Sequence, residues 1–212
     1  MDSIAKPPLS DALLASLSER GDLHAYARGD EIIREGEQSD ALYILVAGQV
    51  KVYTRDERGR ELVYNMLQPG EFFGEMFLDG GPRSASAKAA TDVQCVVVGP
   101  DEFRAFMKDY PEFAESLVLK LIARVRHSTQ QIRSLALSGV FERTVTLIDR
   151  LAMEVNGVRL LPASVTQQEI ADRVGATREM VNHIFRDLAR GGYIDRDDAR
   201  RTTILKDLPR QL

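Results

Sequence analysis

The sequence predicts an α+β protein: an N-terminal antiparallel β-roll, then a long helix, then a small helical domain that ends in a β-hairpin. Three observations support this order. Short β-rich runs separated by glycines fill residues 23–100, an apolar heptad pattern begins after residue 111, and two short capped helices precede a last β-rich stretch. Strands and helices are segregated along the chain, which disfavours a doubly wound parallel sheet. We expect three parts, at residues 1–110, 111–138 and 139–212.

The composition is that of a soluble globular protein. The 212 residues can bury one large core or two modest cores of about 100 residues each. No apolar run approaches the roughly 20 residues that span a bilayer. The first residues have neither a basic start nor a continuous apolar stretch, so no signal peptide is expected. With a single cysteine, Cys95, the chain is expected to be cytoplasmic and to have no membrane partner.

Residues that carry metal or covalent chemistry are sparse. One cysteine cannot build an iron–sulfur cluster or a thiolate zinc site, and no nucleophile–base arrangement is visible. We therefore expect no metal, no cofactor and no enzymatic activity. His24, His127 and Cys95 are scattered singly, which leaves a haem or redox sensor as an open alternative.

Net charge does not decide whether the chain binds nucleic acid. Residues 1–137 carry 16 basic and 21 acidic side chains, a net charge of −5, and residues 138–212 carry 12 and 11, a net charge of +1. Any prediction of DNA binding must therefore come from the pattern of residues rather than from bulk electrostatics.

The first β-rich region consists of short strands expected at residues 41–46, 49–54 and 61–67, and "DVQCVVVGP" adds another strand. Glycines mark the turns of this region: Gly29, Gly36, Gly48, Gly59 and Gly70. Strands this short and this evenly punctuated predict an antiparallel barrel or roll.

After Pro100 the apolar spacing becomes helical, and Pro111 suits the first turn of a new helix. Within that helix six residues follow alternating steps of three and four, a heptad pattern of about three repeats. They form what we call the apolar seam: Val118, Leu121, Val125, Ser128, Ile132 and Leu135. Such a seam is typical of two helices that pack as a coiled coil, so we expect a homodimer. An amphipathic helix that faces its own core would give the same pattern.

The last part begins with the helical stretch "FERTVTLIDRLAMEV" and continues with a turn and a short strand, "NGVRLLP". Thr166 and Glu169 form the T-x-x-E pattern of a capping box that starts a short helix, and Gly175 ends it. Thr177 can cap the next helix. That helix has a buried apolar face, formed by Val181, Ile184, Phe185 and Leu188.

The opposite face of this helix is polar and contains Arg178, Glu179, Asn182, His183 and Arg186. A polar face is often only a solvated surface. Here, however, the closing stretch "GGYIDRDDARRTTIL" predicts a hairpin after the two helices, which together make a winged helix-turn-helix. In that setting the polar face predicts DNA recognition.

The stretch "FFGEMFLDGGPRSASA", residues 72–87, combines a carboxylate, a guanidinium and a Gly-Gly-Pro turn. A guanidinium suits a bidentate oxyanion such as phosphate. A carboxylate beside a phosphate is tolerated if it accepts a hydrogen bond from the same ligand, for example from a sugar hydroxyl. The stretch therefore suggests a phosphorylated sugar, and a surface Glu–Arg pair is the alternative.

From about Leu23 to Leu205 the chain resembles the cAMP receptor protein/FNR (Crp/Fnr) family of bacterial transcription regulators. Residues 72–87 resemble the phosphate-binding cassette of that family, and "ARGDEIIREGEQSDALYILVAGQVKVY" is similar to the β-roll of its cyclic-nucleotide-binding domain. The resemblance implies that Glu75 takes the ribose 2′-hydroxyl and Arg83 the cyclic phosphate. It assigns further contacts to the backbone near Gly74 and Met76, to Ser84 on the phosphate, and to Ser128 and Thr129 on the adenine.

The implied effector is cAMP or another cyclic nucleotide, bound without any additional cofactor. Its binding is expected to rotate the dimer helices and to shift the population between two packings. Arg83 follows Glu75 by eight residues, one or two fewer than in the relatives. Cyclic di-GMP, a haem or redox signal, and action without an effector are therefore alternatives on the same scaffold.

The resemblance also implies the partners. A dimer of winged helices is expected to bind an inverted repeat in double-stranded DNA, with half-site centres about 10–10.5 base pairs apart. We expect Arg178 to read a guanine, Glu179 a cytosine, and His183, in place of a third base-reading arginine, an adjacent base. Phosphate contacts are expected at Thr166, Gln168, Thr177 and Arg186. RNA polymerase is the expected protein partner. Its candidate contact segments are "TRDERGRE" and "AMEVNGV", for which exposed charged turns are the simpler interpretation.

Overall fold

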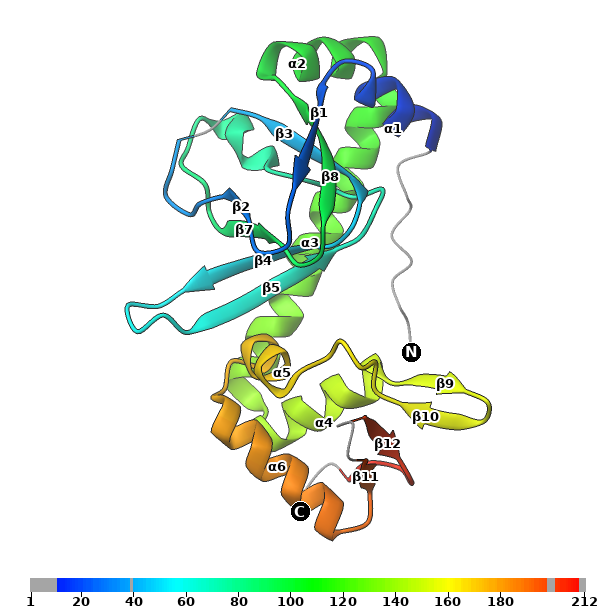
Figure 1. Ribbon diagram of the computed structural model, residues 1–212. Coiled ribbons are helices and arrows are strands. Elements are labelled where there is room, and N and C mark those ends of the chain that lie inside the picture. The colour runs from blue at the N-terminus through cyan, green and yellow to red at the C-terminus, as the bar shows by residue number, and fades with distance from the viewer. Residues whose placement is uncertain (1–10, 39, 198–200, 210–212) are drawn as a thin grey trace. The chain divides into compact units, whose positions relative to one another are not determined.

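The computed structural model describes residues 11–38, 40–197 and 201–209 (Figure 1). The chain forms two compact units, one of residues 1–54 and 64–128 and one of residues 55–63 and 129–212. The first is rich in strands and the second in helices, so the predicted α+β class is confirmed.

The N-terminal strands build two four-stranded antiparallel sheets, in the orders β1-β8-β3-β6 and β2-β7-β4-β5. Neighbours in these sheets are mostly distant in sequence, as in a roll. The strands are β1 (Asp22–Tyr26), β2 (Glu31–Ile33), β3 (Leu42–Ala47), β4 (Val50–Arg55), β5 (Glu61–Leu67), β6 (Phe72–Phe73), β7 (Ser86–Ala89) and β8 (Val93–Val98). The three strands expected near residues 41–46, 49–54 and 61–67 are β3, β4 and β5.

The core of this unit lies between the strands and is completed by helices α1 (Asp11–Ser18) and α2 (Pro100–Asp109). Phe103, Phe106 and Phe113 are fully buried, and their rings meet edge to face. Cys95 is also buried, and this burial raises the pKa of its thiol to about 12. The thiol is therefore protonated at neutral pH and behaves as a small core residue.

Helix α3 (Pro111–Leu137) begins at the proline that interrupts the helical stretch, as expected. Its core-facing side is formed by Phe113, Leu117 and Lys120, which are buried. The apolar seam lies elsewhere on the helix. Leu121 packs partly against the core, but Val125 is 66% exposed and Ile132 is 67% exposed. A core-facing role therefore does not account for the seam.

Besides the end of α3, the described residues of the second unit form the helices α4 (Val140–Leu151), α5 (Gln167–Val174) and α6 (Arg178–Arg190). They pack with a four-stranded antiparallel sheet in the order β11-β12-β10-β9. Its strands are β9 (Met153–Val155), β10 (Val158–Leu160), β11 (Ile194–Arg196) and β12 (Thr202–Ile204). We call the β11–β12 hairpin the wing; residues 198–200 lie outside the described residues. All four apolar residues expected on α6 are buried: Val181, Ile184, Phe185 and Leu188.

One boundary expected from the sequence is wrong. The stretch up to Val155 reads as a single helix, but α4 ends at Leu151 and residues Met153–Val155 form strand β9. Asn156 and Gly157 both have positive φ, 53° and 75°, which are the values of a type I′ hairpin turn. This turn pairs Val155 with Val158, so tertiary pairing overrides the local helical tendency.

A single side chain joins the ends of two helices in this unit. Arg143, in the first turns of α4, donates from Nε to the carbonyl oxygen of Val174, the last residue of α5, at 2.9 Å. Its Nη1 donates to the carbonyl oxygen of Ser138 at 2.5 Å, just beyond α3, and to that of Leu135 at 3.5 Å. These are carbonyls that a helix end leaves without an intrahelical partner.

Candidate functional site

Residues 72–87, which we call the cassette, run from β6 through the short 3₁₀ helix η1 (Glu75–Asp79) into β7. Gly74 and Gly80 flank η1 with left-handed backbone conformations, φ 84° and 75°. Between them Glu75 and Phe77 point inward and are buried, whereas Met76 is exposed. The left-handed conformations of Gly74 and Gly80 thus bend the chain so that the side chain of Glu75 points into the protein.

The guanidinium of Arg83 is buried inside this loop, with 4% of the residue exposed. Nη2 donates to the carbonyl oxygen of Ala41 at 2.8 Å, and Nη1 donates to that of Gly74. Burial lowers the pKa of Arg83, while Tyr43, Glu75 and Asp40 act in the opposite direction. A Cβ added to Gly74 would lie 2.9 Å from Nη1 of Arg83, so only glycine leaves room for this guanidinium.

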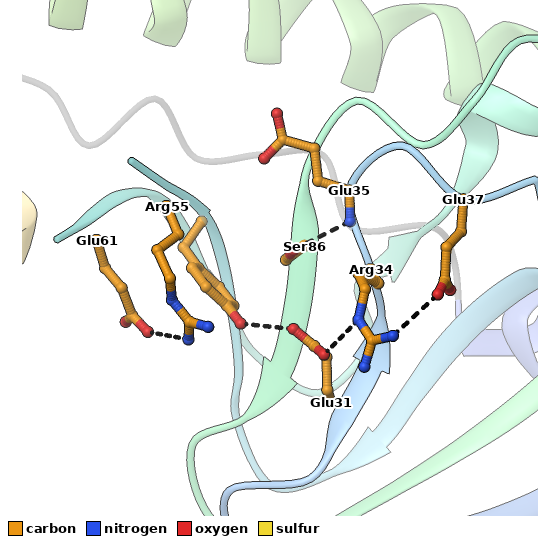
Figure 2. Close-up of polar contacts among 8 residues, drawn as sticks. Glu31, Arg34, Glu35, Glu37, Arg55, Glu61 and Ser86 are labelled. Carbon is orange, nitrogen blue, oxygen red and sulfur yellow. Dashed lines mark hydrogen bonds and ion pairs between the residues drawn. The ribbon is translucent and has the colours of Figure 1, made fainter. Parts of the chain in front are cut away.

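The main chain of Arg83 is anchored as well. Its N–H donates to the carbonyl oxygen of Glu37, and its carbonyl oxygen accepts from the N–H of Gly36, at 2.9 and 2.8 Å. The loop that supplies these partners is itself fixed, because Arg34 pairs with both Glu31 and Glu37, as Figure 2 shows.

Two further contacts hold this loop to its neighbouring strands. The N–H of Glu35 donates to the hydroxyl of Ser86 at 3.0 Å (Figure 2). The hydroxyl of Tyr53 donates to Glu31 at 2.9 Å. Arg83 therefore sits in a framework of polar contacts made by this chain.

Two basic residues of α3 complete the site, and sequence reasoning missed both. Arg124 donates to the Oε1 of Glu75 and to the carbonyl oxygen of Phe72. The ammonium of Lys120, one turn earlier and buried, lies 3.5 Å from the carbonyl oxygen of Gly70. Both cations lie over the ring of Phe72, at 4.7 Å for Lys120 and 5.1 Å for Arg124. A basic pair four residues apart in "KLIARV", next to the seam, is the signal that could have revealed this contact.

The structure thus brings Gly74, Glu75 and Arg83 together in one loop and links that loop to α3. Ser84 and Met76 are exposed at its surface. Ser128 lies one helical turn beyond Arg124 on α3, and both Ser128 and Thr129 are exposed.

The second candidate site is the polar face of α6. Arg178, Glu179, His183 and Arg186 are exposed. A hydrogen bond from its own main-chain N–H and one with the hydroxyl of Thr177 lower the pKa of Glu179, so its carboxylate remains charged at neutral pH. Nε2 of His183 lies 3.3 Å from Oδ2 of Asp187, a partner that the sequence analysis did not foresee.

The residues expected to contact phosphates surround this face. Thr166 and Thr177 are N-caps, and their hydroxyls accept from the N–H groups of Glu169 and Met180 at 3.1 and 3.3 Å. The carboxylate of Glu169 pairs with Arg173. Of the two contacts of the expected capping box, the structure shows the one in which the hydroxyl of Thr166 accepts from the N–H of Glu169. Gln168 is exposed and donates to Asp172 at 2.7 Å.

Within the described ranges, no group of three or more His, Cys, Asp or Glu side chains is placed to hold a metal ion. No helix in the described part of the chain combines the length and apolar content needed to cross a membrane.

Comparisons with known proteins match two regions of the chain. Residues 23–110 match the family of the cyclic nucleotide-binding domain, and residues 142–210 match that of the Crp-like helix-turn-helix domain. The chain is 34% identical over 186 residues to the CRP-like cAMP-activated global transcriptional regulator of Mycobacterium tuberculosis, covering 85% of this chain and 83% of that protein.

Two solved structures have the same fold. One is the c-di-GMP responsive global regulator CLP of Xanthomonas campestris, with a TM-score of 0.81, 22% identity, and coverage of 93% of this chain and 99% of that one. The other is a CRP/FNR-family transcriptional regulator from Thermus thermophilus, with a TM-score of 0.72, 29% identity, and coverage of 87% and 94%.

Proposed function

Because the chain belongs to the Crp/Fnr family of DNA-binding transcription regulators, we propose that it acts as a homodimer whose DNA affinity is set by a cyclic nucleotide, cAMP in the first place. The observation that carries this proposal is the contact of Arg124 with Glu75 and with the carbonyl oxygen of Phe72. Through it, the loop that binds the effector is bonded directly to helix α3. Any ligand that changes the partners of Glu75 therefore changes a contact of α3.

The chemistry of the cassette supports a phosphorylated ribose as the ligand. Arg83 offers a planar guanidinium that is already fixed by two main-chain carbonyls, and fixed donors lose little entropy when they bind an oxyanion. Glu75 is an acceptor-only carboxylate when ionised, which suits a ribose hydroxyl. Ser84 is exposed beside Arg83 and is the proposed second phosphate donor.

The proposed dimer uses the apolar seam of α3. Val118, Val125 and Ile132 are more than half exposed on the chain, and a second copy of the helix would cover them. Ser128 and Thr129 lie in this region of α3 and are the proposed adenine contacts. In this scheme the effector stabilises one packing of the two α3 helices over another, and the two recognition helices α6 read an inverted repeat.

RNA polymerase is the proposed protein partner of the DNA-bound dimer. The β9–β10 hairpin supports a contact of this kind, because Met153, Val155 and Val158 are exposed on it. Single exposed apolar side chains are common on protein surfaces, but a cluster of them often marks a surface that contacts another protein.

Calorimetric titration of the purified chain tests the effector. We expect cAMP to bind, and Glu75→Ala to lose less affinity for 2′-deoxy-cAMP than for cAMP, since the deoxy ligand lacks the hydroxyl that Glu75 would accept. Parallel titrations with cGMP and cyclic di-GMP test the alternative effectors. DNA binding measured with and without the bound ligand then tests the gating; an equal affinity in both states would contradict it.

Sedimentation tests the dimer. Leu121→Glu places a charge in the seam and should give monomers, whereas the wild-type chain should sediment as a dimer without DNA. The monomeric variant should also lose effector affinity if Ser128 contributes to the site. A wild-type monomer at tens of micromolar would contradict the gating scheme.

A further inference from the structure

One side-chain contact on the exposed face of α6 involves a residue that is proposed to read a base. Nε2 of His183 lies 3.3 Å from Oδ2 of Asp187, one helical turn further along. Asp187 is also held on its other side, since Oδ1 lies 3.8 Å from Nη1 of Arg190. The carboxylate of Asp187 thus lies between an imidazole and a guanidinium of the same helix, and it occupies one of the two ring nitrogens of His183.

The stability of α6 gives this contact little purpose. The side chain of His183 is 73% exposed and that of Arg190 is 78% exposed, and ion pairs as exposed as these contribute little to stability. The helix is held by its buried apolar face, which His183 does not share. Among the described residues, His183 makes no hydrogen bond or ion pair with another element. A role in binding is therefore the more informative interpretation.

The contact decides which ring nitrogen carries the proton. An ionised carboxylate only accepts hydrogen bonds, so the ring nitrogen that faces Asp187 has to be the donor. A neutral imidazole has a single N–H, and its other nitrogen is an acceptor. With the proton on Nε2, Nδ1 of His183 is an acceptor. Nδ1 has no hydrogen-bond partner among the described residues.

This acceptor lies on the face of α6 that is proposed to enter the major groove. Glu179, His183 and Arg186 follow one another at steps of four and three residues, so they share one side of the helix. All three are exposed, and the buried apolar residues lie on the opposite side. His183 therefore adds a hydrogen-bond acceptor between the carboxylate of Glu179 and the guanidinium of Arg186.

An acceptor restricts the bases that His183 can read. In the major groove, guanine presents the acceptors O6 and N7 and thymine presents O4, whereas the donors are the amino groups N6 of adenine and N4 of cytosine. An arginine only donates, so at this position it would read a guanine. A histidine that accepts requires an amino group instead, and this reverses the base preference.

We propose that His183 accepts a hydrogen bond from the exocyclic amino group of an adenine or a cytosine in each half-site, and that Asp187 is the positioning residue that makes His183 an acceptor. This inference rests on the proposed reading of an inverted repeat by α6, and it names the base chemistry of one position in that repeat. Asp187 acts through the imidazole and is not expected to contact the base.

Site selection from a randomised pool, at about pH 8 where histidine side chains are ordinarily neutral, tests the pair. The wild type should select adenine or cytosine beside the guanine read by Arg178, and His183→Ala should lose the preference at that position alone. Asp187→Lys replaces an acceptor by an ammonium that only donates, so Nε2 must accept and the ring proton moves to Nδ1. The selected base should then change to guanine or thymine.

Two controls separate this effect from charge and from direct reading by the new lysine. Asp149→Lys makes the same change of charge on α4, where Asp149 forms an exposed ion pair with Arg159, and it should keep the wild-type motif. The double variant His183→Ala/Asp187→Lys should show no preference at the position. A guanine selected by the double variant would mean that the lysine reads the base, and the inference would lose its main support.

Base analogues show which amino group is read. Purine in place of adenine, or 2-pyrimidinone in place of cytosine, removes only the amino group from the selected duplex. By fluorescence anisotropy, one of these substitutions should weaken wild-type binding about two- to tenfold for each half-site, the effect of one hydrogen bond. His183→Ala should bind the natural and the substituted duplex equally. If the wild type also bound both equally, the proposed hydrogen bond would not exist.

The failure of this inference is distinguishable from failure of the proposed function. If the wild type selected no sequence, with or without cAMP, the proposed function itself would fail. If it selected an inverted repeat with guanine or thymine at this position, or if Asp187→Lys kept the wild-type base, only the roles of His183 and Asp187 would be wrong. Thermal unfolding followed by circular dichroism establishes that each variant is folded before its motif is compared.

Discussion

The cassette and the recognition helix carry similar residues in opposite settings. In the cassette, Glu75 and Arg83 are buried, and both make hydrogen bonds inside the protein. On α6, Arg178 and Glu179 are exposed, and the apolar face that holds the helix in place is on its other side. In the first region the groups proposed to bind a ligand also maintain the fold, and in the second the proposed binding residues and the residues that maintain the fold are different.

The physical basis of this difference is desolvation. A buried charge is tolerated only when it is paired or hydrogen-bonded, so Glu75 and Arg83 need partners inside the protein. An exposed charge keeps its water and needs none. Substitutions in the cassette should therefore change stability and binding together, whereas substitutions on α6 should change binding alone. Four variants test this contrast, and we take them from the largest expected effect to the smallest.

Arg83→Leu should have the largest effect. It removes the proposed charge-assisted contact to the cyclic phosphate, of about 2–5 kcal/mol, so cAMP binding at micromolar ligand should vanish. It also leaves the carbonyl oxygens of Gly74 and Ala41 without this donor, and an unsatisfied buried acceptor costs about 1–3 kcal/mol. Titration calorimetry and thermal unfolding check the two losses. Arg104→Leu is the control on an exposed surface. If Arg83→Leu lost cAMP binding but kept the wild-type Tm, the expected coupling of stability and binding in the cassette would be wrong.

Gly74→Ala separates backbone strain from crowding. Alanine at φ 84° costs about 1–2 kcal/mol, and its Cβ would also meet Nη1 of Arg83 at 2.9 Å and the carbonyl oxygen of Ala41 at 3.0 Å. Gly59→Ala is a matched control, because Gly59 has φ 77° and no atom within 4 Å of the added Cβ. Urea unfolding should show a larger loss at position 74, and only that variant should lose effector affinity. Equal losses would mean that Arg83 moves aside freely.

Arg178→Ala should cost about 1–3 kcal/mol of DNA binding for each half-site and relax specificity at one base pair. Its Tm should stay within about 1 °C of the wild type, because Arg178 is exposed and the buried face of α6 is unchanged. Site selection and thermal unfolding on the same preparation measure both. A clear drop in Tm would show that the reading surface also supports the fold.

Arg186→Ala should have the smallest effect. As a phosphate contact it should weaken all sequences about equally and reduce the salt slope by about 0.9 for each half-site. The selected motif should not change, and stability should not change either. If Arg186→Ala selected a different DNA motif, Arg186 would be a base-reading residue, and the proposed docking of α6 in the groove would be wrong.

Much of the fold could be predicted because the local spacing of apolar residues along the chain indicates it. The buried face of α6 follows from the helical spacing of Val181, Ile184, Phe185 and Leu188, and Pro111 marks the start of α3. The boundary at residues 152–155 was missed, since pairing across the Asn156–Gly157 turn decides it.

The candidate sites divide in the same way. The cassette residues Gly74, Glu75 and Arg83 are close in sequence and could be named together. Arg124 could be singled out only as one of the basic pair in "KLIARV"; its partner Glu75 could not be named, because the contact joins positions 49 residues apart.

The bonds made by Arg143 have a mechanical consequence. Between α3 and α4 lie only Ser138 and Gly139, a joint that would otherwise bend easily, because glycine restrains the backbone least. The guanidinium spans this joint, tying the last carbonyls of α3 to the last carbonyl of α5. These hydrogen bonds oppose bending at Ser138 and Gly139, so we expect the end of α3 and the end of α5 to move together. Arg143 is thus expected to stiffen the connection between α3 and α4.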